Sequence, residues 1–337
     1  MRTLLSLLVL ANPLWAAPPP TVEPAEGRRI VFSPEKWEAA QVEPRFEAWT
    51  GRHLSLLTLP GKVTPAMAEH YLRQLDLGWE TYADLTGRKP ATFKQYAGMP
   101  TVTAVPSPSF TCGAGCGFVG SSGVELALFY DRDTRDWVRN PQAFPHYGFY
   151  ELGRNFYTFG RRHDAFTTGF AVFMRYVCMD RTGAVDLELA QRHHIERMID
   201  VFATSPEPFV RTFTAYDGLS EKQPRLRDAQ GKALPTCDQP VMYASAMLRL
   251  RRDLGGDDWV RRFFAALALC PETKAVDRPT ARRQCLAWYA CASAAAGRDL
   301  ADRFVTGWRL DLTPEERARF ASAPWGRPEL DLTALLK

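Results

Sequence analysis

Two neighbouring stretches of the chain determine its fold: His146-Tyr-Gly-Phe-Tyr-Glu-Leu-Gly-Arg-Asn-Phe-Tyr-Thr-Phe159 and Phe166-Thr-Thr-Gly-Phe-Ala-Val-Phe-Met-Arg-Tyr176. Apolar residues of the first stretch recur at i, i+3, i+7 and i+10, which predicts a helix over 146–159 with one buried face. Tyr150 and Arg154, at i and i+4, project together from another face, beside Glu151. The second stretch predicts a following helix over 166–180. The expected buried positions of the first helix are Phe149, Leu152, Phe156 and Phe159.

The rest of the 337-residue chain differs on the two sides of this region. Before it, runs such as 101–105 and 124–130 have the β-branched and aromatic composition of strands. After it, nearly every segment has the periodicity of a helix. We therefore predict an α+β protein with a small sheet in an N-terminal subdomain, 29–145, a mainly helical subdomain, 146–337, and a cleft between the two.

The N-terminus has the features of a secretory signal, namely a basic start, a short apolar stretch and small residues at its end. We expect residues 1–16 to be a signal peptide and 17–28 to be a proline-rich leader. The mature protein is then secreted, periplasmic or part of the cell envelope, and no other window is apolar enough to span a membrane. Lys and Arg number 42 against 38 Asp and Glu, so the net charge of +4 does not indicate a nucleic-acid partner.

Export also affects how the seven cysteines are interpreted, because disulfides form in oxidising compartments. Cys112 and Cys116 enclose Gly-Ala-Gly, which allows a tight disulfide loop, with a metal-binding hairpin as the alternative. Cys178 follows an apolar run and is expected to be a buried free thiol. One or two further disulfides are expected in the C-terminal half. The candidates for them are Cys237, Cys270, Cys285 and Cys291.

The segment Tyr150-Glu-Leu-Gly-Arg154 has the spacing of H-E-x-x-H, in which two histidines bind zinc and the glutamate polarises a water. Together with Thr168-Gly169 and Arg175 in the next predicted helix, it resembles the gluzincin metallopeptidases, in the branch of the plant basic secretory proteins and the enhancin-like peptidases. The resemblance covers roughly residues 65 to 322. It implies a zincin-like fold in which 124–130 is the edge strand beside the cleft.

All three residues at the implied zinc-ligand positions are replaced, because Tyr150 and Arg154 stand where the two histidines would be and Thr168 where the third ligand would be. A catalytic zinc needs three protein ligands and a water. At ~4 Å and an effective dielectric constant of ~20, a guanidinium opposes a divalent ion by ~8 kcal/mol. We therefore expect no zinc or other cofactor, and we interpret Glu151 as a vestigial general base that pairs with Arg154 or Arg175. The expected residues of the binding cleft are Tyr150, Arg154, Thr168, Arg175 and His146.

Three functions remain open at this point. The first is a non-catalytic pseudo-peptidase that binds a peptide or a glycan in the cleft. The second is an active metallopeptidase or other hydrolase, either with zinc relocated to His146, Glu151 and His163 or without metal through Glu151 and Tyr150 as acid and base. The third is a structural protein of the cell envelope. We favour the first, because the ligand positions have changed on an otherwise recognisable frame.

Overall fold

The computed structural model describes residues 22–159, 164–214, 230–232, 238–271 and 275–337. These residues form a mixed sheet of seven strands in the order β1-β2-β3-β5-β7-β6, and β4 pairs with β5 beside this path. The β3–β5 and β5–β7 pairs are parallel, and the other pairs are antiparallel. The strands are Val22–Glu26 (β1), Arg45–Thr50 (β2), Ser55–Thr58 (β3), Gln95–Tyr96 (β4), Met99–Ala104 (β5), Gly115–Gly117 (β6) and Val124–Leu126 (β7).

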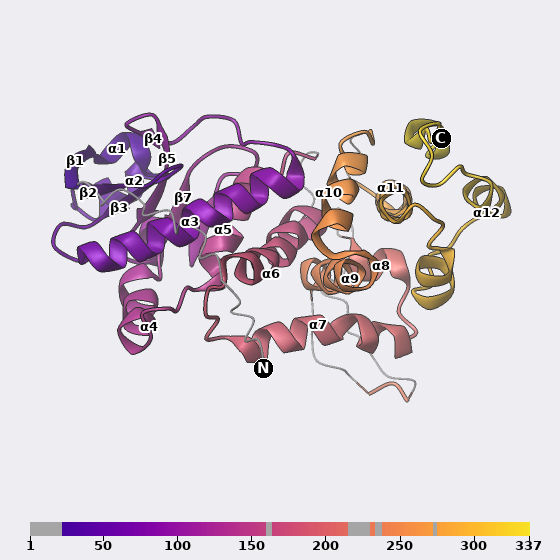
Figure 1. Cartoon of the computed structure of the whole chain (residues 1–337). Helices are drawn as coiled ribbons and strands as arrows, with labels where there is room; N and C mark the ends of the chain where they lie inside the picture. Colours follow the sequence, from indigo (N-terminus) through magenta and orange to yellow (C-terminus); the bar gives the residue numbers. More distant parts are fainter. Residues whose placement is uncertain (1–21, 160–163, 215–229, 233–237, 272–274) are drawn as a thin grey trace, which may run out of the picture.

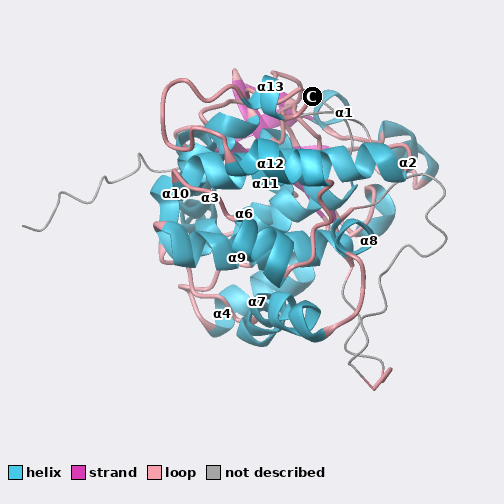
Figure 2. Ribbon diagram, turned by 90° about the vertical axis from the view of Figure 1, so that its right-hand side faces the viewer, coloured by secondary structure: helices cyan, strands magenta, loops and turns pink. Residues whose placement is uncertain are grey.

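Helices make up most of the remaining structure, so the α+β class predicted from the sequence is confirmed. Figure 1 shows the sheet with α3 at one end of the molecule, α5 and α6 in the middle, and α9 to α12 at the other end. In Figure 2 the C-terminal helices lie in front of the strands. The helices are Gly27–Ile30 (α1), Pro34–Ala39 (α2), Pro65–Thr86 (α3), Thr134–Arg139 (α4), His146–Phe156 (α5), Gly169–Thr182 (α6), Leu189–Thr204 (α7), Phe209–Phe213 (α8), Gln239–Leu254 (α9), Gly256–Leu267 (α10), Arg278–Ala296 (α11), Pro314–Ala321 (α12) and Leu332–Leu335 (α13).

Three π-helical turns and one short 3₁₀ helix complete the helical structure of the described residues. The 3₁₀ helix is Pro108–Phe110 (η1), and the π-helical turns are Phe129–Asp133 (η2), Asp164–Thr168 (η3) and Asp302–Gly307 (η4). Turn η3 leads directly into α6, so the predicted second helix begins later as an α-helix than its apolar pattern indicated. Turn η2 replaces the second half of the strand that we predicted over 124–130. In the described part of the chain, no helix combines the length and the apolar character needed to cross a membrane.

Helix α5 is buried on the face that the sequence predicted, because Phe149, Leu152 and Phe156 are each fully buried. It ends at Phe156, earlier than predicted, so Phe159 lies beyond the helix and is only half-buried. It packs closely on α3, whose Tyr82 hydroxyl donates a hydrogen bond of 2.8 Å to the Phe149 carbonyl. Gly153 permits this approach, since a Cβ at that position would lie 2.4 Å from the Tyr82 oxygen. Residues from β2 to α13 form one continuous hydrophobic cluster around α3, α5, α6, α9 and α11.

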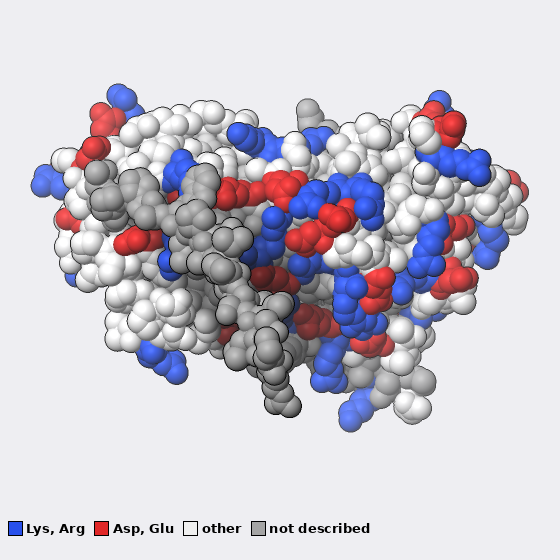
Figure 3. Space-filling model, viewed as in Figure 1, with Lys and Arg blue, Asp and Glu red and all other residues white. Residues whose placement is uncertain are grey.

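Ion pairs also join helices that are far apart in the sequence. Asp84 of α3 lies 2.6 Å from an Arg181 nitrogen of α6 and 2.8 Å from an Arg261 nitrogen of α10. Asp180 of α6 pairs in the same way with Arg192 of α7 and Arg251 of α9, at 2.8 Å and 2.5 Å. Figure 3 shows acidic and basic side chains alternating over the region where these helices meet. The arginines of this region therefore have acidic partners.

The prediction of a leader over 17–28 is wrong from Val22 onward. Residues Val22–Glu26 form strand β1, which pairs with β2 at one edge of the sheet, and α1 follows directly. An edge strand tolerates a proline such as Pro24, because only one side of the strand must form ladder hydrogen bonds. Residues 1–21, and with them the predicted signal peptide, lie outside the described residues.

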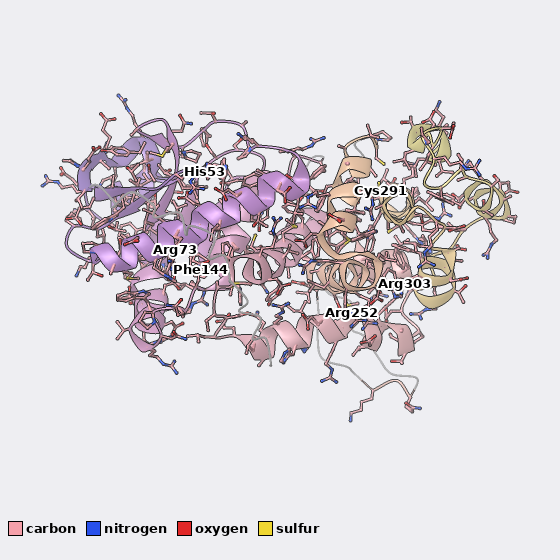
Figure 4. The ribbon with its side chains drawn as sticks, viewed as in Figure 1. His53, Arg73, Phe144, Arg252, Cys291 and Arg303 are labelled. Carbon is pink, nitrogen blue, oxygen red and sulfur yellow. A yellow bond between two sulfur atoms is a disulfide. The ribbon has the colours of Figure 1, made fainter. Side chains whose placement is uncertain are left out.

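Two of the cysteine predictions are confirmed, whereas the further disulfides expected in the C-terminal half are absent among the described residues, because Cys270, Cys285 and Cys291 are free thiols. Cys112 and Cys116 form a disulfide, and Cys178 is a buried free thiol. Cys270 and Cys291, which lies on α11 (Figure 4), have their sulfur atoms 3.2 Å apart as free thiols. The contact with Cys291 lowers the pKa of the Cys270 thiol. Cys285 is buried and free, and Cys237 lies outside the described residues.

We predict that Cys270 and Cys291 form a second disulfide when the protein is made in an oxidising compartment, because a small shift of either side chain brings the sulfur atoms into bonding distance. Alkylation in denaturant without reductant, followed by peptide mass spectrometry, should find both thiols protected. Relative to the oxidised native protein, Cys291→Ser should lower the free energy of unfolding by about 3 kcal/mol. Reduced native protein is the matched control, and full alkylation of Cys270 in oxidised protein would contradict the prediction.

Candidate functional site

The site is built where α5 passes closely beneath strand β6 at the end of the sheet. A Cβ at Gly117 of β6 would lie 2.2 Å from the Glu151 carbonyl oxygen, so only glycine allows this approach. Asn155 of α5 fastens the β6–β7 hairpin, because its Nδ2 donates to the carbonyls of Phe118 and Gly123, each at 2.9 Å. The edge strand beside the site is therefore β6. Strand β7, which we expected at the edge, is an interior strand.

Tyr150, Arg154 and Thr168 converge, as the aligned ligand positions predicted. The Nη1 atom of Arg154 donates to the Tyr150 hydroxyl at 3.2 Å and to the Thr168 hydroxyl at 3.4 Å. Tyr150 and Arg154 lie one turn apart on α5, and Thr168 is the last residue before α6. One guanidinium thus occupies the centre of the three positions.

These three side chains do not fit a zinc ion. The guanidinium has only N–H donors and a fixed positive charge, whereas zinc needs lone-pair donors. The two hydroxyls already accept hydrogen bonds from Arg154. Within the described ranges, no group of three or more His, Cys, Asp or Glu side chains gathers at one point. The alternative zinc site of His146, Glu151 and His163 includes a residue outside those ranges.

We predicted that Glu151 forms an ion pair with Arg154 or Arg175. Among the described residues, neither pair is formed. Glu151 is instead buried, with 6% of its surface exposed, and accepts a hydrogen bond from the Gly117 N–H. Burial raises the pKa of its carboxyl to about 7, although Arg154 and the Gly117 N–H act in the opposite direction. Our pairing prediction failed because the side chain of Arg154 bonds to Tyr150 and Thr168, while that of Glu151 reaches β6.

A cleft of about 610 Å³ opens beside this cluster. Arg175 of α6 lines this cleft. Its guanidinium lies over the rings of Tyr176 and Tyr150, at 4.6 Å and 5.9 Å from their centroids. His146, at the start of α5, is also buried in its wall. Residues of both predicted subdomains, 29–145 and 146–337, line the cleft. Its lining comprises Ala114, Leu128, Arg132, His146, Tyr147, Tyr150, Glu151, Arg175, Glu188, Ala190 and Gln191.

The cleft is lined by four of the predicted site residues, namely His146, Tyr150, Glu151 and Arg175. Arg154 and Thr168 do not line it, and Arg154 bonds to Tyr150 and Thr168 beside it. Another wall of the cleft, formed by turn η2 and the start of α7, was not predicted from the sequence. There Glu188 lies 3.2 Å from an Arg132 nitrogen and 2.5 Å from Nε2 of His146. His146 holds the pKa of Glu188 below its ordinary value, and Arg132 and Arg175 contribute to this.

Asp133 and Tyr147 support the same wall. The Tyr147 hydroxyl donates to Asp133 at 2.8 Å, and the Arg132 guanidinium lies 4.4 Å from the Tyr147 ring centroid. Burial raises the pKa of Asp133 to about 7. The sequence Asp131-Arg132-Asp133 has the appearance of a solvated charge run, so no sequence signal separates this wall from an exposed turn.

We predict that Glu151 makes the protein less stable as the pH rises. Because its folded pKa of about 7 exceeds the ordinary value of 4.5, the folded state binds the extra proton between these values. The free energy of unfolding then falls by about 3 kcal/mol over this interval. Glu151→Gln, which keeps an acceptor for Gly117, should remove that fall.

Urea unfolding of the native protein and of the variant at about pH 5 and about pH 8 measures the effect. The variant should gain stability relative to the native protein at the higher pH. Glu69→Gln, an exposed change on α3, is the control and should show equal effects at both pH values. Equal effects of Glu151→Gln at both values would contradict the prediction.

Comparison with known proteins gives a fold relative and no family. No family model matches the chain, and no curated protein matches it. Among solved structures, the chain is similar to the crystal structure of a functionally unknown conserved protein from Bacillus anthracis str. Ames, with a TM-score of 0.52 and 11% sequence identity. The match covers 90% of this chain and 57% of that one, so this chain spans little more than half the length of that protein. At this identity, the likeness concerns the fold alone.

Proposed function

We propose that this chain is an exported, non-catalytic protein on a gluzincin-like scaffold and that its former active-site cleft binds a peptide. One observation supports this most directly. The three positions that would hold zinc ligands lie together, and the Arg154 guanidinium bonds to both of the other side chains. Those positions were assigned from the resemblance of the sequence to the gluzincin motifs, so their convergence supports that resemblance.

The surrounding architecture supports the same proposal. A gluzincin-like active site needs a helix below an antiparallel edge strand and a second helix that brings the third ligand. Here α5 lies against β6, which pairs antiparallel with β7 at the end of the sheet. The start of α6 supplies Thr168.

The loss of catalysis follows from charge and from hydrogen bonding. Arg154 provides a permanent cation in the place of a Lewis acid, and its protons are not released near neutral pH. The Glu151 carboxyl, which would activate a water, is bonded to the Gly117 N–H and has little contact with solvent. Without a metal-bound water there is no activated nucleophile for a general base to act on.

A peptide is the favoured ligand because the edge of the sheet lies beside the cleft. In β6 the residues bonded to β7 alternate, as Ala114 accepts from Ala127 and Phe118 donates to Gly123. The main-chain groups of Gly115 and Gly117 therefore point away from β7. The Gly117 N–H is already bonded to Glu151, so a peptide would pair with the remaining main-chain groups of this edge. Ala114, next to this edge, lines the cleft. An extended peptide gains main-chain hydrogen bonds at such an edge.

Restoring the three ligands tests the scaffold. We predict that the triple variant Tyr150→His, Arg154→His, Thr168→Glu binds one zinc per chain, because the side chains at these positions already converge. Metal analysis after native purification measures this, and Arg154→His alone is the matched control, expected to bind none stoichiometrically. A folded triple variant without zinc would contradict the gluzincin-like assignment, and stoichiometric zinc in the native protein would contradict the loss of the site.

Filling the cleft tests binding. We predict that Ala190→Trp, an exposed change in the cleft wall on α7, reduces retention of short synthetic peptides by about tenfold or more. Ala203→Trp, on an exposed turn of the same helix away from the cleft, should retain them. Pools of peptides and of oligosaccharides are incubated with each protein, and the retained molecules are identified by mass spectrometry. Retention of oligosaccharides alone, or peptide hydrolysis that Glu151→Gln abolishes, would overturn the proposal.

A further inference from the structure

The cleft contains a buried arginine that has no carboxylate within ion-pair distance in the described part of the chain. Arg175 is 7% exposed, and among the described residues its Nε has no hydrogen-bond partner. Its Nη2 donates to the Tyr176 hydroxyl at 2.9 Å, which is a neutral acceptor. Within the described ranges, no carboxylate oxygen lies within 4.0 Å of it. Arginines elsewhere in the helical region, such as Arg192 and Arg251, each pair with acidic residues.

A buried, unpaired guanidinium is costly unless something satisfies its charge and its donors. Two carboxyl groups of the cleft are already engaged, because Glu188 pairs with Arg132 and His146, and Glu151 accepts from Gly117. Asp186, whose charge acts on Tyr176, accepts from the Glu188 N–H through Oδ1, and its buried Oδ2 has no hydrogen-bond partner among the described residues. Arg175 therefore lines a cleft of about 610 Å³ and has a buried N–H donor without a partner among the described residues.

The guanidinium is also held in a fixed orientation. It stacks over the Tyr176 ring, and the Tyr176 hydroxyl fixes one of its nitrogens. The planar fork of an arginine matches the two oxygens of a carboxylate, and prior stacking reduces the entropy lost on binding. A second arginine, Arg132, lines the same cleft, and its Nη2 also has no hydrogen-bond partner among the described residues.

The overall charge around the cleft favours an anion. Three arginines, Arg132, Arg154 and Arg175, lie in or beside the cleft together with four carboxyl groups, those of Asp133, Glu151, Asp186 and Glu188. Burial raises the pKa values of Asp133 and Glu151 to about 7, so near neutral pH these two acids carry less than two negative charges together. The arginine charges are therefore in excess as the pH falls below neutral.

We propose that the cleft recognises its peptide through a carboxylate, which binds to the guanidinium of Arg175 with Arg132 beside it. This inference rests on the proposed peptide-binding function and adds the chemical class of the ligand. The carboxylate belongs either to the C-terminus of the peptide or to an aspartate or glutamate side chain. Both sources present the same carboxylate group to the cleft. Amidation of the C-terminus removes the first source and leaves the second.

The experiment uses the full mature chain and three pools of short synthetic peptides. The first pool has free C-termini and no Asp or Glu, the second has amidated C-termini with Asp or Glu, and the third has amidated C-termini and no acidic residue. Fluorescence anisotropy of labelled pools measures binding. We expect the first or the second pool to bind about tenfold to a hundredfold more tightly than the third, as for hydrogen bonds to a charged group.

Variants then assign the preference to Arg175. Arg175→Gln should remove the difference between the pools, and Arg175→Lys should keep only part of it, because lysine lacks the planar fork. Arg192→Gln is the matched control, since Arg192 also lies over the Tyr176 ring but pairs with Asp180 and Glu196. Circular dichroism of each variant checks that it is folded, and Arg175→Lys keeps the test valid if Arg175→Gln does not fold.

The outcomes separate the two proposals. If all three pools bind equally and Ala190→Trp blocks all of them, the carboxylate inference is wrong and the peptide-binding function stands. If no pool binds, both are wrong. If the preference persists in folded Arg175→Gln or Arg175→Lys at its native strength, the carboxylate binds elsewhere and the assignment to Arg175 is overturned.

Discussion

The close approach of α5 to strand β6 is the constraint on which the site depends. Gly117 allows the strand to lie against the main chain of α5, and the buried side chain of Asn155 bonds to both ends of the following turn. A helix held at this distance places Tyr150 and Arg154 on one side of the strand and Glu151 directly against it. If either contact were lost, the hairpin would move away from the helix and the cleft would lose its upper wall.

Within that frame, the chemistry of the site depends on one side chain. The Arg154 guanidinium carries a charge that opposes a divalent cation at this point, and it donates to the half-buried hydroxyls of Tyr150 and Thr168. The Glu151 carboxyl is buried and bonded to β6, which makes it part of the wall.

The cleft itself combines two features that are usually separate. In one wall Glu188 pairs with both Arg132 and His146. Arg175, which also lines the cleft, has no carboxylate within ion-pair distance among the described residues. Within this network Arg132 still has nitrogen atoms without a hydrogen-bond partner among the described residues, and Arg175 adds a second such cation. Two cations of this kind beside one cleft favour the recognition of an anion, in agreement with the ligand proposed above.

The sequence alone determined the α+β class, the buried face of α5, the tight Cys112–Cys116 loop and the three positions that meet around Arg154. These follow from local spacing, which the helix period and glycine content express directly. Only the tertiary structure decided that β6 is the edge strand, that Val22–Glu26 joins the sheet and that Glu151 bonds to β6 and not to Arg154. The wall of Arg132, Asp133 and Glu188 was equally invisible, because a charge run has the same sequence pattern whether it is solvated or folded against a distant helix.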